Sequence, residues 1–75
     1  MTNTIELKYA ILKAKKTNKS LASDLGLNEN TFAKKLYNKS EFKASEISAL
    51  VNVLGLDEEQ KNKIFFGKEV DLKST

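Results

Sequence analysis

The chain has 75 residues, enough for one small domain, and contains neither cysteine nor histidine. This composition excludes a disulfide framework, a thiolate or imidazole metal site and the usual nucleophile–base pairs of hydrolases. The formal net charge is +3, but residues 1–43 carry nine lysines and four acidic side chains, a net +5, whereas residues 44–75 carry −2. A basic N-terminal half favours a polyanionic partner such as nucleic acid, although a solvated lysine face has the same composition.

The N-terminus has no targeting pattern. The first ten residues lack the basic start and apolar core of a signal peptide. No apolar run approaches the roughly 18 residues that are needed to span a bilayer. We therefore expect a cytoplasmic protein that does not associate with membranes.

Apolar residues recur at helical spacing along the chain and no segment alternates like a strand, so the sequence predicts an all-α fold. The first helix is expected over residues 4–16. Thr17 can cap the second helix, which is expected to end at Gly26 because glycine readily adopts the left-handed conformation that closes a helix. The apolar face of these two helices consists of Leu7, Ala10, Ile11, Ala14, Leu21, Ala22 and Leu25.

Three more helices are expected downstream. Asn28 can cap the third, and Asn38 is the non-glycine residue best suited to the left-handed position at its end. The fourth helix is expected to stop at Gly55, and the fifth to open at Asp57 in a capping box. With a polar tail at residues 68–75, the sequence predicts a single compact domain of five helices. Their expected inward residues are Phe32, Leu36, Ile47, Leu50, Val51, Leu54, Ile64 and one of the pair Phe65 and Phe66.

The second and third helices are joined by only three residues, 26–28. Helices with so short a connection cross steeply, which predicts a helix-turn-helix motif over about residues 17–38 of the domain that spans residues 1–75. With the apolar residues of the third helix against the core, a rotation of about 100° per residue puts Asn30 and Lys34 at the centre of its outward face. Such side chains hydrogen-bond base edges, and a helix fits the roughly 12 Å width of the DNA major groove.

Five short motifs carry a resemblance to a known family: Leu21-Ala22, Gly26, TFAKKLYNK at residues 31–39, EI at 46–47 and IFF at 64–66. Over about residues 5–66 the chain resembles the small helix-turn-helix regulators of the Cro and phage-repressor type, the XRE-like family. The resemblance implies a lambda-repressor-like fold, a recognition role for the third helix and an approach of residues 17–19 to the DNA backbone. Two positions depart from the pattern, since Tyr37-Asn38 stands where relatives often have Asn-Gly, and Lys43 where they often have threonine.

These observations and the resemblance together predict the residues that contact DNA. Base contacts are assigned to Glu29, Asn30, Thr31 and Lys34; Glu29 has a second interpretation, that it merely favours the helix N-terminus. Contacts to the DNA backbone are assigned to Thr17, Asn18, Lys19, Asn28, Lys35, Tyr37, Asn38, Lys39 and Lys43. Phe66, with Val70 and Leu72, is predicted to form the contact of a weak homodimer; the alternative for Val70 and Leu72 is that they fold back to cover the core.

The predicted function is that of a sequence-specific transcriptional regulator that binds double-stranded DNA, a phage-type repressor or Cro-like protein acting by operator occupancy. No cofactor, metal, small-molecule substrate or enzymatic activity is expected, because the serines lack an activating histidine and the acidic residues 57–59 suit the first turn of a helix. The alternative left open is a protein-binding module, an antirepressor or antitoxin, that uses the same helices against a protein.

Overall fold

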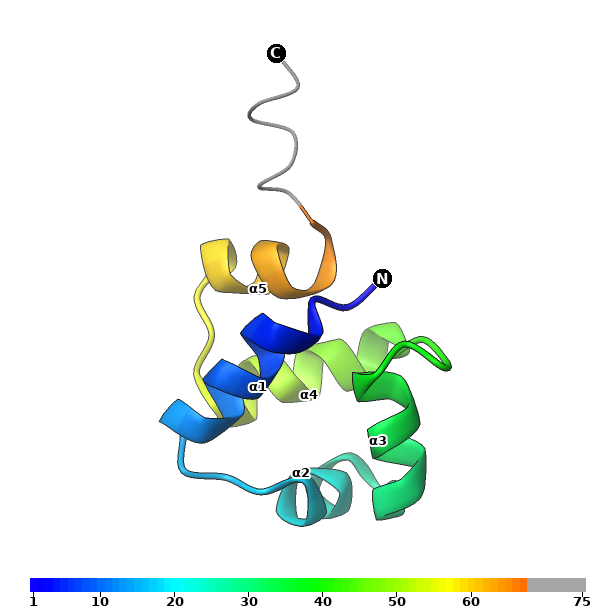
Figure 1. Ribbon diagram of the computed structural model, residues 1–75. Helices are drawn as coiled ribbons and strands as arrows, with labels where there is room; N and C mark the ends of the chain where they lie inside the picture. The colour runs from blue at the N-terminus through cyan, green and yellow to red at the C-terminus, as the bar shows by residue number, and fades with distance from the viewer. Residues whose placement is uncertain (68–75) are drawn as a thin grey trace.

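A computed structural model describes residues 1–67, and all regular structure in this range is helical. The all-α prediction is therefore confirmed for the described residues. None of their helices has the length and hydropathy that a membrane span requires. The elements in chain order are α1 (Thr4–Lys13), α2 (Asn18–Leu25), α3 (Glu29–Leu36), α4 (Ala44–Leu54) and α5 (Glu58–Phe65) (Figure 1).

The predicted N-caps hold the starts of three helices. The side chains of Thr17, Asn28 and Asp57 each accept a hydrogen bond from the backbone N–H three residues further on, at 2.8–3.0 Å. Asn3 caps α1 in the same way, at 3.2 Å from the Glu6 nitrogen. Each cap satisfies a backbone donor that has no partner within its own helix.

The helices α1 to α4 end in one common way, at a residue with a positive φ angle. These residues are Lys15 (φ 60°), Gly26 (74°), Asn38 (66°) and Gly55 (66°). The N–H of the residue after each one donates back to a carbonyl five residues earlier, at 2.8–3.1 Å, which satisfies a carbonyl at the end of the helix.

The prediction for the first helix was three residues too long. The helix stops at Lys13 because Lys15 takes a left-handed conformation. The sequence predicted this conformation only for glycine and asparagine residues at the ends of other helices. The first and second helices are consequently joined by a real turn at residues 14–17, and Thr17 remains the N-cap of α2.

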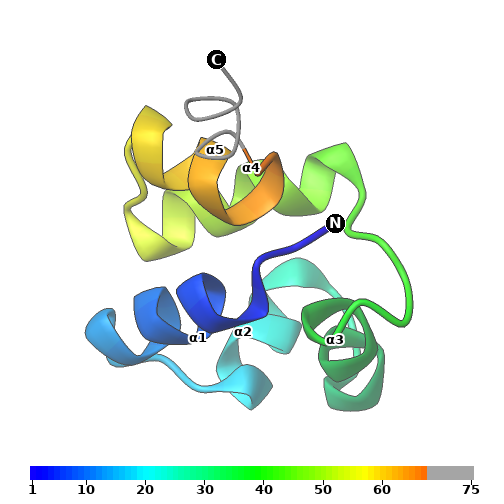
Figure 2. The same cartoon turned by 45° about the horizontal axis from the view of Figure 1, so that its top comes forward.

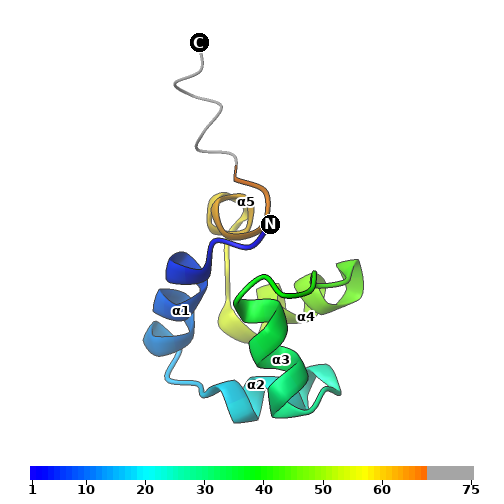
Figure 3. The same ribbon diagram turned by 45° about the vertical axis from the view of Figure 1, so that its right-hand side comes forward.

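The core lies where the five helices meet. In Figures 1 and 3, α2 packs against α3 and α4, and α1 lies against α5. Three phenylalanines form a continuous edge-to-face chain through this core: Phe32 to Phe42 at 5.8 Å and Phe42 to Phe65 at 5.9 Å between ring centroids. The other buried apolar residues are Leu7, Ala10, Ile11, Leu21, Ala22, Leu36, Leu50, Leu56 and Ile64.

Candidate nucleic-acid interface

The turn between α2 and α3 fixes the direction in which α3 leaves the core. Gly26 has a φ angle of 74°, and a Cβ added there would meet no atom within 4 Å. Glycine is therefore needed at this position for its conformation, not for space. Asn28 then starts α3, which crosses α2 steeply and lies at the edge of the molecule (Figure 3).

The outward face of α3 is polar. Asn30 and Lys34, one turn apart, are both exposed, and so is Glu29 in the first turn. Thr31 is half-buried beside them. The buried residues of the helix are Phe32, Lys35 and Leu36. The four residues predicted to read bases are thus brought together on one short helix, with Thr31 the least accessible of them.

The residues predicted to contact the DNA backbone lie at the start of α2, on α3 and in the loop that follows α3. Those with exposed side chains are Thr17, Lys19, Asn28, Tyr37, Lys39 and Lys43, and Asn18 is half-buried. Lys39 and Lys43 lie in and beside the loop that follows α3, while Thr17 and Lys19 lie at the start of α2. Lysines therefore lie at the start of α2 and after the end of α3.

Lys35 does not belong to this surface, and its prediction as a DNA-backbone contact is corrected. Its side chain is 9% exposed, and its Nζ lies 2.8 Å from Oε1 of Glu46, whose side chain is equally buried. The rotation per residue explains the position: Lys35 follows Phe32 by three residues, so it lies on the core side of α3. The spacing of Lys35 from Phe32 was visible in the sequence. So was Glu46, the third residue of α4, whose carboxylate pairs with the Lys35 ammonium.

Glu46 is the centre of this buried polar contact. Besides Lys35, its Oε1 accepts a hydrogen bond from the backbone N–H of Lys43 at 2.8 Å, which caps α4 in place of the missing side-chain cap. Burial alone raises the pKa of the Glu46 carboxyl. The hydrogen bonds from Lys35 and Lys43, together with the charges of these lysines, outweigh burial and hold that pKa below its ordinary value.

Asn38, also predicted to contact the DNA backbone, is half-buried and its side chain is engaged within the fold. Its amide oxygen accepts from the N–H of Thr2 at 2.8 Å, and its amide nitrogen donates to the Thr2 carbonyl at 2.9 Å. Thr4 Oγ1 donates to the Leu36 carbonyl at 2.7 Å, and the Asn3 N–H donates to the Ile64 carbonyl at 2.7 Å. The N-terminal segment, residues 2–4, therefore joins the end of α3 to α5 (Figure 2).

Replacing Asn38 by glycine is expected to lower the free energy of unfolding by about 1–3 kcal/mol, because two hydrogen bonds to Thr2 are lost. Asn38→Ala should cost roughly 1 kcal/mol more, since alanine tolerates the positive φ angle less well. Urea unfolding followed by circular dichroism measures both. Equal stability of the glycine variant and the original chain would show that the contact with Thr2 does not hold α3.

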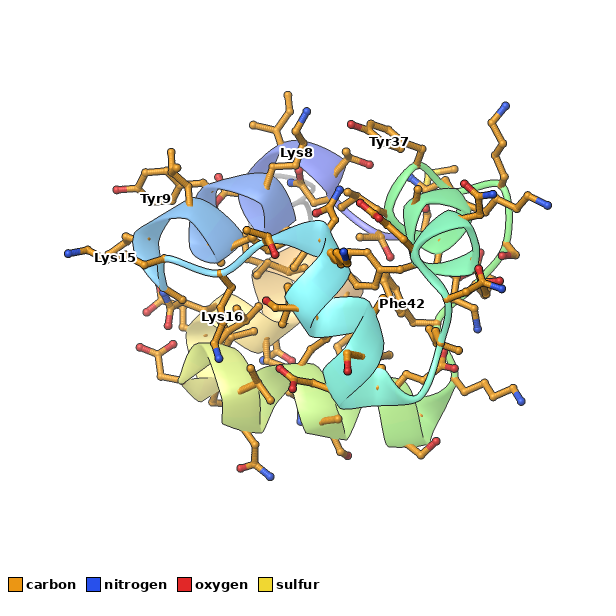
Figure 4. All side chains as sticks on the ribbon, turned by 90° about the horizontal axis from the view of Figure 1, so that it is seen from below. Lys8, Tyr9, Lys15, Lys16, Tyr37 and Phe42 are labelled. Carbon is orange, nitrogen blue, oxygen red and sulfur yellow. The ribbon has the colours of Figure 1, made fainter. Side chains whose placement is uncertain are left out.

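Tyr37 is held by a residue that sequence reasoning had left outside the site. The Nζ of Lys8 donates to the Tyr37 hydroxyl at 3.1 Å and lies 5.4 Å from the centre of its ring. Figure 4 shows the two side chains together at the edge between α1 and α3. Lys8 thus extends the basic surface from α1 to the end of α3, and no local sequence pattern indicates a contact between residues 29 positions apart.

The pair Phe65 and Phe66 divides as expected. Phe65 is 6% exposed in the core, whereas Phe66 is 52% exposed. Phe66 is therefore accessible to a partner, as the predicted homodimer contact requires. Val70 and Leu72, which were predicted to join it, lie outside the described residues.

The described chain is a small all-α protein in which a three-residue turn presents a short polar helix. Residues 5–68 match the family described as "Protein of unknown function (DUF739)", and the chain belongs to this family. No curated protein and no solved structure matches the chain.

Proposed function

We propose that the protein is a sequence-specific transcriptional regulator that binds double-stranded DNA in the cytoplasm, a phage-type repressor or Cro-like protein acting by operator occupancy. The observation that carries the proposal is the placement of α3. This helix follows α2 after a tight turn, buries its apolar residues and exposes Asn30 and Lys34 at the edge of a basic surface. A helix so placed can enter the major groove.

The side chains on α3 have the chemistry for direct reading. The Asn30 amide can pair with adenine N6 and N7, and the Lys34 ammonium can donate to guanine O6 and N7. Glu29 can accept from a cytosine amino group. Exposed lysines on both sides of the helix-turn-helix, Lys19, Lys39 and Lys43, supply contacts to phosphates that position the helix without carrying sequence information.

Selection of binding sites from random duplex DNA tests the function most broadly. The proposal predicts an enriched motif of a few base pairs, because α3 has about two turns. Recovery of sequences without any enriched motif would contradict sequence-specific binding.

The alternative function is a protein-binding module, an antirepressor or antitoxin, that uses the α2–α3 surface against a protein. Hot spots of protein interfaces are typically large apolar or aromatic side chains. The large apolar residues of α3, Phe32 and Leu36, are fully buried. The helix itself therefore exposes no anchor of that kind. The aromatic residue that follows it, Tyr37, is 50% exposed and is paired with Lys8. The polar outward face of α3 favours DNA over a protein as its ligand.

Affinity for DNA is expected to fall linearly on a logarithmic plot against salt concentration. Each phosphate neutralised by Lys19, Lys39 or Lys43 should contribute about 0.9 to the slope. Lys39→Ala should therefore flatten the slope by about one unit, whereas Lys61→Ala, on α5, should leave it unchanged. Fluorescence anisotropy with a labelled duplex gives these slopes, and an affinity independent of salt would rule out the arrangement.

We propose further that two copies pair weakly through Phe66 and bind half-sites about one helical turn, roughly 34 Å, apart. A helix of about two turns reads few base pairs, so a second copy is needed for useful affinity. Sedimentation of the complex should give two chains per operator, and Phe66→Ser should weaken the pairing. One chain per operator at saturating concentration would refute the dimer.

A further inference from the structure

Helix α1 exposes a stripe of large apolar side chains. Ile5, Tyr9 and Leu12 are 79%, 58% and 74% exposed. Their spacing of four and then three residues places them on one face of the helix. The buried apolar residues of α1, namely Leu7, Ala10 and Ile11, lie on the opposite side, against the core. The three side chains of the stripe therefore take no part in the core of the described residues.

A groove adjoins the C-terminal end of this stripe. It is an open, shallow depression of about 190 Å³ between α1 and the start of α2. Its lining residues are Lys8, Ile11, Leu12, Lys16, Thr17 and Asn18. The apolar part of this lining, Ile11 and Leu12, continues the stripe and can receive an aliphatic side chain.

The stripe is framed by positive charge. Lys8 and Lys13 border it on its two sides, and Lys15 and Lys16 follow at its C-terminal end; all four are exposed. Figure 4 labels Lys8, Lys15 and Lys16 beside Tyr9. The one carboxylate of α1, Glu6, lies on a flank of the stripe, 3.6 Å from Lys63, which offsets its charge. An occupant of this face must therefore bring both apolar and acidic groups.

Charge also decides between possible occupants. If two copies paired antiparallel through their α1 stripes, the two Lys8 side chains would meet near the centre of the contact and repel each other. A lipid surface has the right charge, but the apolar face extends over only about two turns and is hollowed beside Leu12, which suits a side chain better than a bilayer. A protein segment with flanking carboxylates meets both conditions.

We infer that the α1 face, defined as Ile5, Tyr9, Leu12 and the adjoining groove, docks a partner protein through an acidic amphipathic helix. An aliphatic anchor of that helix enters the groove, and its Asp or Glu side chains lie against Lys8 and Lys16. The inference concerns a surface other than the outward face of α3. Lys8, whose Nζ also donates to the Tyr37 hydroxyl, is the residue that the α1 face shares with the basic surface.

A synthetic helical peptide of about 15 residues, with leucines on one face and glutamates beside them, is the probe. Titration of the full chain, followed by backbone amide NMR shifts, should perturb α1 and the start of α2. Leu12→Ser should weaken binding at least tenfold. Lys8→Glu should weaken it similarly and improve binding of a control peptide with lysines in place of the glutamates. Lys61→Ala, which removes a lysine from α5, should leave the affinity for the acidic peptide unchanged.

Three results would overturn the inference. Equal binding of the acidic and basic peptides would show that charge does not select the occupant. Binding of anionic lipid vesicles that Leu12→Ser abolishes, without binding of the peptide, would assign the face to a membrane. Concentration-dependent self-association that Leu12→Ser abolishes would assign it to a second copy.

Discussion

Lys35→Ala is expected to lower the free energy of unfolding by about 3–5 kcal/mol, because it leaves the buried Glu46 carboxylate without its ionic partner. A domain of this size has only about that much net stability. The variant should therefore be largely unfolded at room temperature. Thermal unfolding followed by circular dichroism measures the effect.

The neighbouring lysine provides the matched control. Lys34→Ala removes the same side chain one position earlier, on the exposed face, and should change stability by no more than about 0.5 kcal/mol. The double variant Lys35→Met with Glu46→Gln removes both charges but keeps an acceptor for the Lys43 N–H, so it should be more stable than Lys35→Ala. Equal, small effects of Lys34→Ala and Lys35→Ala would contradict the buried pair.

The same pair determines how stability responds to acid. The pKa of Glu46 is lower in the folded chain than its ordinary value, so the unfolded chain binds the proton more readily. The stabilisation is present in full above the ordinary glutamate pKa and is lost as the pH falls through the lower folded pKa. Between about pH 6 and pH 3 the original chain should consequently lose more stability than the double variant.

Asn30→Ala and Lys34→Ala are each expected to weaken binding to the selected site by about 1–3 kcal/mol and to relax the base preference at one position. Both side chains are exposed on the outward face of α3 and take no part in the core. Their removal should therefore change recognition without changing the fold. Competition binding with single-base variants of the site measures the preference, and unaltered melting temperatures provide the control.

Much of the fold could be predicted because it depends on local chemistry. Thr17, Asn28 and Asp57 cap helices through contacts three residues away, and Gly26 and Gly55 end helices through their own backbone freedom. Lys15 was missed because lysine does not favour the left-handed conformation that it adopts here. Local patterns thus indicated both starts and ends of helices wherever the residue at the boundary favours the conformation or the contact that it makes.

The candidate site was predictable in part: the burial of Lys35 was indicated by its spacing from Phe32, whereas other roles depend on distant contacts. The positions of Asn30 and Lys34 follow from the period of one helix. The roles of Asn38 and Lys8 depend on partners in distant segments, Thr2 and Tyr37, which no local pattern connects. A polar side chain that the sequence assigns to a ligand can therefore form its hydrogen bonds within the folded chain instead.

The claim that α3 reads DNA sequence is tested most directly by comparing Lys34→Ala with Lys39→Ala across every single-base variant of the selected site. Lys34 lies on the outward face of the helix, whereas Lys39 lies beyond its end, where the proposal assigns it to a phosphate. The account predicts that Lys34→Ala loses preference at one position, and that Lys39→Ala weakens all sequences alike. Uniform losses in both variants, with no position relaxed in either, would contradict it.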